Sequence, residues 1–361
     1  MLAQEERELM AHEDRQARKT FALWKLLLPV IIGVGVVAWM FWRDASQQNL
    51  GQILSQIHFT PYVIGCVVLA CLFMLGRDFG LSLRFRILTD RDLKWKQAIK
   101  VTYLCEFTSA VSPSAVGGSA LGMVYLNREG IDIGRATTLM LTTLFLDELF
   151  LVVMAPTMIL LSPAREIFDI GSTSFSLGLG LTFWLVYAGV FIYTTLLFLG
   201  ILVKPRAVAS FLRRLFSLPF LRRWKPQVEA MGDNMIATSA VLKSKPLKFW
   251  LKAFGATVMS WLSRYLVVNA IFLAFVPSAD PEQFLILARQ VVVWVLLMIS
   301  PTPGGSGLSE WLFKEVYGAL VPTVGLALFM AIFWRLISYY VYLIVGVCIL
   351  PKWFTKFSKK Q

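Results

Sequence analysis

The chain has 361 residues, of which 57% are hydrophobic, 14% are aromatic and only 16% are charged. Soluble domains carry roughly a quarter charged residues, so this composition argues against soluble domains and predicts a membrane protein. The 35 Lys and Arg residues outnumber the 22 Asp and Glu residues, giving a net charge of +13. This charge lies in short segments between apolar runs, which indicates an anionic membrane surface rather than nucleic acid as the partner.

Six apolar runs are long enough to cross a bilayer, which takes about 20 residues. In chain order they are approximately 22–42, 61–83, 136–161, 179–203, 249–276 and 322–350. They predict an all-α, polytopic membrane helix bundle with about six full spans. The first run has no cleavage-site pattern before it, so we expect an anchor rather than a removed signal. The domains expected are a cytoplasmic N-terminal segment (1–21), a single transmembrane domain (22–350) and a basic cytoplasmic tail (351–361).

Two further apolar stretches, about 98–126 and 284–318, are interrupted by proline and glycine. The interruptions read SPSAVGG (Ser112–Gly118) and SPTPGGSG (Ser300–Gly307). Half of the first stretch is about 14 residues, or roughly 21 Å of helix, which cannot cross a hydrocarbon core of about 30 Å. We therefore expect each stretch to enter and leave the membrane on one side, as a re-entrant broken hairpin.

The positions of the basic residues predict which loops face the cytoplasm. Basic residues are frequent in the N-terminal segment, at 127–135, at 204–248 and in the C-terminal tail. The connection after the second span is also expected inside, and it holds Arg84, Arg86, Arg91, Lys94 and Lys96. The spans then close only if one hairpin dips from each side, as in an inverted-repeat transporter. Two kinked helical pairs without symmetry are the alternative.

The connection 204–248 contains the stretch AVASFLRRLF, in which apolar residues alternate with paired arginines. It predicts either an interfacial helix at the level of the lipid head groups or a solvated linker.

Ionisable side chains within apolar runs cost several kcal/mol each unless they are paired or hydrated. Those found here are Glu106, Asp147, Glu148, Arg264, Arg289, Glu310 and Arg335. They form either structural salt bridges or a polar cavity between the hairpins, in which arginines attract a phosphate. Half-helices beginning near Gly117–Ser119 and Gly305–Ser309 would add N–H groups for an anion.

Asp147 and Glu148 point in different directions on a helix, so only one need face such a cavity. Arg77 and Asp78, near a span end, are expected to reach the interface.

The residue types argue against an enzyme. The histidines, His12 and His58, lie in polar segments, and the cysteines show no CxxC spacing. The glycine-rich breaks lack the spacing of a phosphate loop and follow no predicted strand. We therefore expect no catalytic residues, no metal and no cofactor.

Two segments resemble the signature regions of the lysylphosphatidylglycerol synthase transmembrane-region family. They are EFTSAVSPSAVGGSALGMVYLNREGI (Glu106–Ile131) and SPTPGGSGLSEWLF (Ser300–Phe313). The family includes the flippase-like half of the bacterial multiple peptide resistance factor. The resemblance implies a lipid-translocating bundle around a cavity open to a leaflet. In the full-length synthases an aminoacyl transferase domain follows the membrane part. Here the chain ends eleven residues after Leu350, so we expect a stand-alone member without that domain.

Together these features predict a flippase or scramblase that moves an anionic phospholipid or lipid phosphate between leaflets. We expect it in a bacterial inner membrane, with both termini cytoplasmic and membrane lipids as ligands. Homo-oligomers and envelope partner proteins are left open. The alternatives are a non-transporting partner or regulator in envelope lipid assembly, and a membrane enzyme that uses Glu106 or Asp147 as a base. The residues expected at the substrate site are Glu106, Ser112, Ser114, Gly117, Gly118, Asp147, Glu148, Arg264, Pro301, Gly304, Gly305, Glu310 and Arg335.

Overall fold

The structure is a computed structural model that describes residues 60–112, 115–162, 164–170, 173–218, 225–276, 283–346 and 348–349. These residues form helices and connecting turns, with no strand among them, so the predicted all-α class is confirmed. The long helices are α4 (Pro61–Leu88), α5 (Trp95–Val111), α6 (Ala115–Arg128), α7 (Ile133–Leu161), α9 (Thr173–Phe198), α11 (Lys225–Leu242), α12 (Leu247–Phe275) and α13 (Gln283–Leu297). The shorter ones are α8 (Ala164–Phe168), α10 (Pro205–Leu215), α14 (Leu308–Tyr317) and α15 (Val324–Arg335).

Within the described residues, 5 helices are long and apolar enough to cross a membrane. They are Pro61–Leu88, Ile133–Leu161, Ser176–Val203, Leu247–Phe275 and Val324–Gly346. Each contains most of a predicted span. The remaining predicted span, 22–42, lies outside the described residues, as do the N-terminal segment and the tail.

Side-chain caps fix where several of these helices begin. The Thr60 hydroxyl accepts a hydrogen bond from the Val63 N–H (3.3 Å) at the start of α4. The Asp132 carboxylate accepts from the N–H of Gly134 (2.9 Å) and of Arg135 (3.2 Å) at the start of α7. Such bonds satisfy N–H groups that have no partner within the first turn of a helix.

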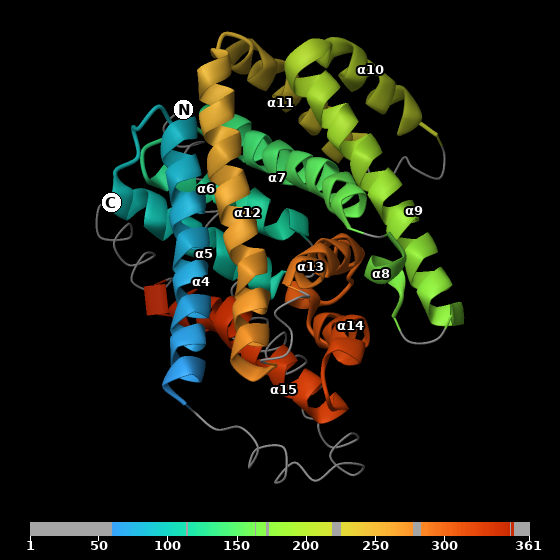
Figure 1. The fold of residues 1–361 in the computed structure, drawn as a ribbon. Coiled ribbons are helices and arrows are strands. Elements are labelled where there is room, and N and C mark those ends of the chain that lie inside the picture. Colours follow the sequence, from blue (N-terminus) through green and yellow to red (C-terminus); the bar gives the residue numbers. More distant parts are fainter. Residues whose placement is uncertain are drawn as a thin grey trace.

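Helices α4 and α12 lie side by side and antiparallel through much of the bundle (Figure 1). Small residues permit this close approach. A Cβ atom added to Gly80 would lie 3.0 Å from the Ala256 carbonyl oxygen, and one added to Gly76 would lie 3.2 Å from Ser263 Oγ. Gly76 and Gly80 form a GxxxG motif, a pattern that lets membrane helices pack closely. The motif was not recognised in the sequence, and it packs two helices of one chain.

Replacing Gly80 with leucine should lower the free energy of unfolding by about 1–3 kcal/mol, because the larger side chain must push α4 away from α12. Thermal unfolding of the purified protein measures this. Gly65→Leu is the control on the same helix, since a Cβ there meets nothing within 4 Å. Equal losses for the two variants would contradict the proposed role of the close contact.

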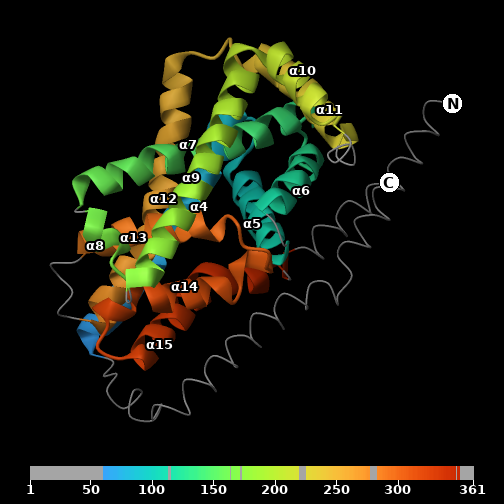
Figure 2. The same cartoon turned by 90° about the vertical axis from the view of Figure 1, so that its right-hand side faces the viewer.

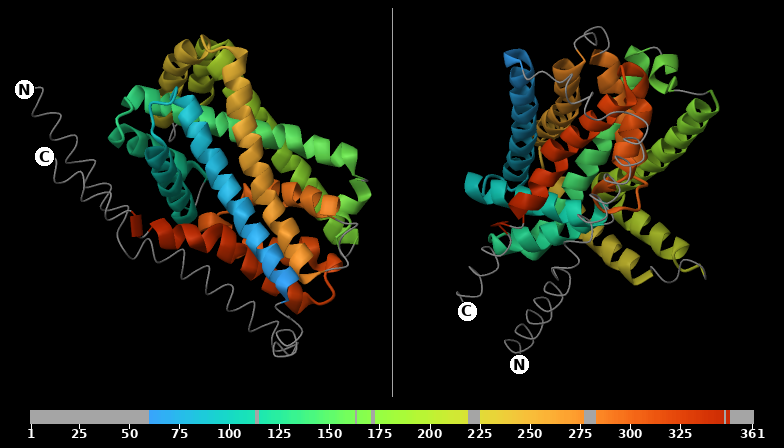
Figure 3. Two further views of the ribbon diagram at one scale, coloured as in Figure 1. Left: turned by 60° about the vertical axis from the view of Figure 1, so that its left-hand side comes forward. Right: turned by 90° about the horizontal axis from the view of Figure 1, so that it is seen from below.

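Helix α7 crosses the α4–α12 pair at a steep angle (Figure 3). Helices α10 and α11 pack on each other at one end of the bundle, whereas α14 and α15 lie at the other (Figure 2). The helix after Arg335 continues through a π-helical turn, η6 (Leu336–Tyr340), to Gly346.

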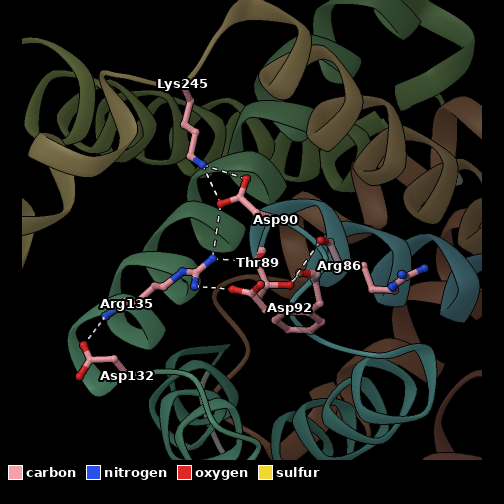
Figure 4. Close-up of polar contacts among 8 residues, drawn as sticks. Arg86, Thr89, Asp90, Asp92, Asp132, Arg135 and Lys245 are labelled. Atoms are coloured by element: carbon pink, nitrogen blue, oxygen red, sulfur yellow. Dashed lines mark hydrogen bonds and ion pairs between the residues drawn. The ribbon is translucent and has the colours of Figure 1, made fainter.

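Charged contacts join three loops at the end where α12 begins (Figure 4). Arg135, in the first turn of α7, pairs with Asp92 (2.6 Å) and Asp90 (3.4 Å) in the α4–α5 loop. Lys245, just before α12, pairs with the same Asp90 (2.7 Å). The sequence predicts all three connections on the cytoplasmic side. The contacts place them at one end of the bundle, and the side of the membrane stays a prediction.

The two interrupted stretches both fold as pairs of packed helices. In the first, Lys100 near the start of α5 pairs with Glu129 after α6, so both outer ends of the hairpin meet. In the second, Arg289 in α13 donates to the Val316 carbonyl near the end of α14 (2.7 Å). The hairpin shape is thus present in both stretches. Their re-entrant placement in a membrane and the inverted repeat stay predictions.

Candidate charged site in the helix bundle

One group of buried charges joins α4, α5 and the last helix. Arg77 is only 3% exposed and pairs with Glu106 and with Asp78 (Nη1–Oδ1 3.0 Å). Its Nη1 also donates to Tyr342 Oη (2.9 Å), and the Tyr342 hydroxyl donates to Asp78 Oδ1 (2.5 Å). Each charge therefore has an opposite charge or a hydroxyl beside it, as a buried ion pair requires.

The expectation that Arg77 and Asp78 reach the interface is wrong. The helix α4 continues to Leu88, so both residues lie well inside it rather than at its end. Glu106 of α5 and Tyr342 of the last helix bind these two residues and offset the cost of their burial.

A second ion pair lies further along α4. Arg84 holds Asp147 with both guanidinium nitrogens (Nη1–Oδ1 2.5 Å, Nη2–Oδ2 3.0 Å). Asp147 Oδ1 also accepts from the indole of Trp261 in α12 (2.7 Å), and Arg84 donates to Thr257 Oγ1 (3.2 Å). Such two-point contacts are the strongest arginine–carboxylate geometry. The prediction that Arg84 lies in the connection after the second span is therefore wrong, because Arg84 is a buried residue of α4.

Glu148, next to Asp147, points elsewhere. It is buried near Tyr193 of α9, and its Oε2 atom has no hydrogen-bond partner among the described residues. The two adjacent acids thus face different helices.

Arg264 differs from the other arginines of this region. Its guanidinium carbon lies 3.9 Å from the centre of the Trp294 ring and 5.7 Å from that of Trp261. Within the described residues it forms no ion pair, and its Nε is buried without a partner. The negative charge of Glu106 is close enough to attract the Arg264 guanidinium, but the Glu106 carboxylate is hydrogen-bonded to Arg77. Arg264 is thus held by aromatic faces, which leaves guanidinium donors for a ligand.

The second break is closed by a separate ion pair. Glu310, fully buried in the first turn of α14, binds Arg335 of α15 (Oε1–Nε 2.9 Å). Its Oε2 accepts from the Gly307 N–H (2.7 Å) and the Ser309 hydroxyl (2.9 Å). Arg335 also donates to the Gly304 carbonyl (3.0 Å). Glu310 and Arg335, predicted as substrate contacts, thus hold the broken backbone in place.

The two breaks meet at Tyr339. Its hydroxyl donates to the carbonyl of Ala110 (3.0 Å), which is one residue before the end of α5. On its other side lies Gly304, where an added Cβ would come within 2.1 Å of the ring and where φ is +56°. Only glycine fits both the backbone angle and the space. The breaks, far apart in sequence, are therefore neighbours in the fold.

The remaining predicted residues occupy these breaks. Ser112 is half-buried at the end of α5, Gly117 and Gly118 lie in the first turn of α6, and Ser114 lies outside the described residues. Pro301 is exposed and Gly305 has a φ of +69°. Of the predicted ionisable residues, Glu106 and Arg264 lie near each other, while Glu310 and Arg335 form the second cluster.

Four residues that complete these charged groups were not among the predicted site residues: Arg77, Arg84, Tyr339 and Tyr342. One signal was available. Arg77 and Arg84 are two helical turns apart, which places them on one face of α4. Arg335, Tyr339 and Tyr342 likewise follow the i, i+4, i+7 spacing of a helix face.

Comparison with known proteins agrees with this picture of a membrane bundle. The profile of the family "Lysylphosphatidylglycerol synthase TM region" matches residues 26–346. A "UPF0104 membrane protein" of Archaeoglobus fulgidus is 22% identical over 338 residues, covering 89% of this chain and 94% of the relative. No solved structure matches the chain. Because the match spans most of its length, this multi-pass membrane protein belongs to the lysylphosphatidylglycerol synthase transmembrane-region family.

Proposed function

We propose that this protein is a flippase or scramblase that moves an anionic phospholipid or lipid phosphate between leaflets. The family takes its name from the membrane region of a lipid synthase, which is consistent with a role connected with membrane lipids. In this proposal the head group passes Arg264 and the neighbouring Arg77–Glu106 pair, while the acyl chains stay in the bilayer.

The observation that carries the proposal is the position of Arg264. Arginine is costly in a membrane interior, and an arginine that lies there without a bonded carboxylate is a candidate contact for an anionic ligand. The formal charges nearby balance, since Arg77, Arg84 and Arg264 accompany Asp78, Glu106 and Asp147. Arg77 takes two of these carboxylates and Arg84 the third. A phosphate would suit the remaining guanidinium, because its oxygens match the planar donors.

Other buried polar groups of the described bundle also lack a partner. Among them are the amide of Gln290, one turn before Trp294 in α13, and the hydroxyl of Tyr265, next to Arg264 in the sequence. Buried polar atoms are nearly always bonded, so unpartnered ones indicate water or a ligand. They support a polar path beside Arg264.

A place for an acyl chain lies beside the second break. A partly open apolar cavity of about 440 Å³ is lined by residues of α9, α13 and α14, including Leu179, Leu296 and Trp311, and by Ile299 just after α13. Ile299 and Leu308, which border this cavity, flank the second break with its Gly304 and Gly305. An apolar cavity of this kind suits a hydrocarbon chain.

The test is lipid translocation in proteoliposomes containing the purified full-length protein. Fluorescent phosphatidylglycerol and phosphatidylcholine in the outer leaflet are bleached by an impermeant reductant, so the protected fraction reports movement. We expect phosphatidylglycerol to move several-fold faster than in empty liposomes, and faster than phosphatidylcholine. Rates equal to those of empty liposomes for several anionic head groups, with and without a proton gradient, would contradict the proposal and favour a regulatory role.

A further inference from the structure

A basic, largely open cavity lies between α10 and α11. These two helices lie at the end of the bundle remote from α14 and α15 (Figure 2). The volume of the cavity is about 540 Å³. The side chains of Lys204, Arg206 and Lys243 line it, together with the apolar side chains of Ala207 and Ile236. The cavity therefore offers cationic groups beside an apolar wall.

The cations of the cavity lack the carboxylates that neutralise their neighbours. Outside it, Arg213 pairs with Asp233 (2.5 Å) and Lys245 with Asp90 (2.7 Å). Within the described part of the chain, Lys204 and Arg206 have no ion-pair partner. The Lys243 ammonium donates to the Val203 carbonyl (3.0 Å), which holds it in position without cancelling its charge. The cavity thus keeps its positive charge.

The backbone adds donors at the same place. Helix α10 begins at Pro205, and its first intrahelical bond runs from the Val208 N–H to the Lys204 carbonyl. The N–H groups of Arg206 and Ala207 precede it and have no partner within the helix. They belong to residues that line the cavity, so backbone donors and cationic side chains border the same space.

Helix α10 has the composition of a helix that lies on a lipid surface. It carries Arg206, Arg213 and Arg214 and no acidic residue. Phe211 is 54% exposed and Leu215 is 37% exposed, so apolar side chains on the helix remain uncovered. This pattern is typical of interfacial helices. It favours the interfacial helix over the solvated linker, and an interfacial helix would lie near lipid head groups.

We propose that this cavity binds a phosphate group, as carried by an anionic phospholipid or a soluble phosphate. The proposal does not depend on translocation, because the cavity lies apart from Arg264 and binding alone is measured. It assigns Lys204 and Arg206 as the main contacts and Lys243 as a further cation.

The experiment uses the purified full-length protein in detergent and native mass spectrometry to count bound dioctanoyl phosphatidylglycerol. The double variant Lys204→Gln/Arg206→Gln should bind about 25-fold more weakly than wild type, since each basic side chain near a lipid surface contributes about fivefold. Lys248→Gln/Lys252→Gln removes the same charge from exposed positions of α12 and should bind as wild type does.

Competition with inorganic phosphate identifies the source of the phosphate. If millimolar inorganic phosphate displaces the lipid, the cavity accepts a free anion; if only phosphatidylglycerol binds, it requires the lipid head group. Both results support the proposal, provided that the double variant loses binding. Equal binding by the wild type and the Lys204→Gln/Arg206→Gln variant, at equal thermal stability, would overturn it.

Discussion

Replacing Arg264 with glutamine should slow the translocation of phosphatidylglycerol by about 10- to 100-fold in proteoliposomes. A hydrogen bond between a charged donor and a phosphate contributes about 1.5–3 kcal/mol, which corresponds to this range of rates. The fold should survive the change, because Arg264 contacts the rings of Trp261 and Trp294 and, within the described residues, forms no salt bridge.

Two companion variants make this result specific. Lys252→Gln removes one positive charge from an exposed position of the same helix and should leave the rate unchanged. Arg264→Lys keeps the charge but loses the planar donors, and should fall between wild type and Arg264→Gln. A wild-type rate for Arg264→Gln would show that the head group does not pass this arginine.

Replacing Glu310 with alanine should cause the largest loss of stability, about 3–5 kcal/mol. The change leaves Arg335 buried without its carboxylate, and removing one partner of a buried pair has a cost of that order. It also frees the Gly307 N–H and the Ser309 hydroxyl, which Glu310 accepts from. Thermal or denaturant unfolding of the purified protein measures the loss.

The double variant Glu310→Leu/Arg335→Met distinguishes the effect of losing the ion pair from the effect of leaving Arg335 buried without a partner. It should recover part of the stability, because two apolar side chains leave no uncompensated ion. Asp233→Ala removes the partner of Arg213 from an exposed pair and should change stability by less than about 1 kcal/mol. If Asp233→Ala and Glu310→Ala had similar effects, the Arg335–Glu310 pair would not be the clamp described here.

The long helices and their approximate positions could be predicted because a bilayer imposes a length and a composition on each span. The breaks at Pro113 and Pro301 were equally visible, since proline and glycine end helices locally. Contacts between helices could not be predicted. Hydrophobicity is only a weak guide to which side of a helix faces lipid and which side faces protein. The pairing of Arg84 with Asp147 could not be predicted, because the second apolar run ends just before Arg84.

The candidate site was predicted in part. The sequence identified Glu106, Arg264, Glu310 and Arg335 because charge in an apolar run is conspicuous. It could not divide them into separate groups, since Glu310 and Arg335 lie in different helices whose packing depends on the whole chain. Tyr339 and Tyr342 gave no such signal, because tyrosine is common in membrane helices.

The last helix carries one residue of each group on a single face: Arg335 binds Glu310, Tyr339 touches both breaks, and Tyr342 binds Arg77 and Asp78. A rotation of this helix about its own axis would withdraw all of these side chains together. The π-helical turn at Leu336–Tyr340 lies within this stretch, and such turns are rare and often occur at functional sites. The second break and the Arg77 cluster are therefore coupled through the last helix, because any rotation of this helix breaks its contacts with both at the same time.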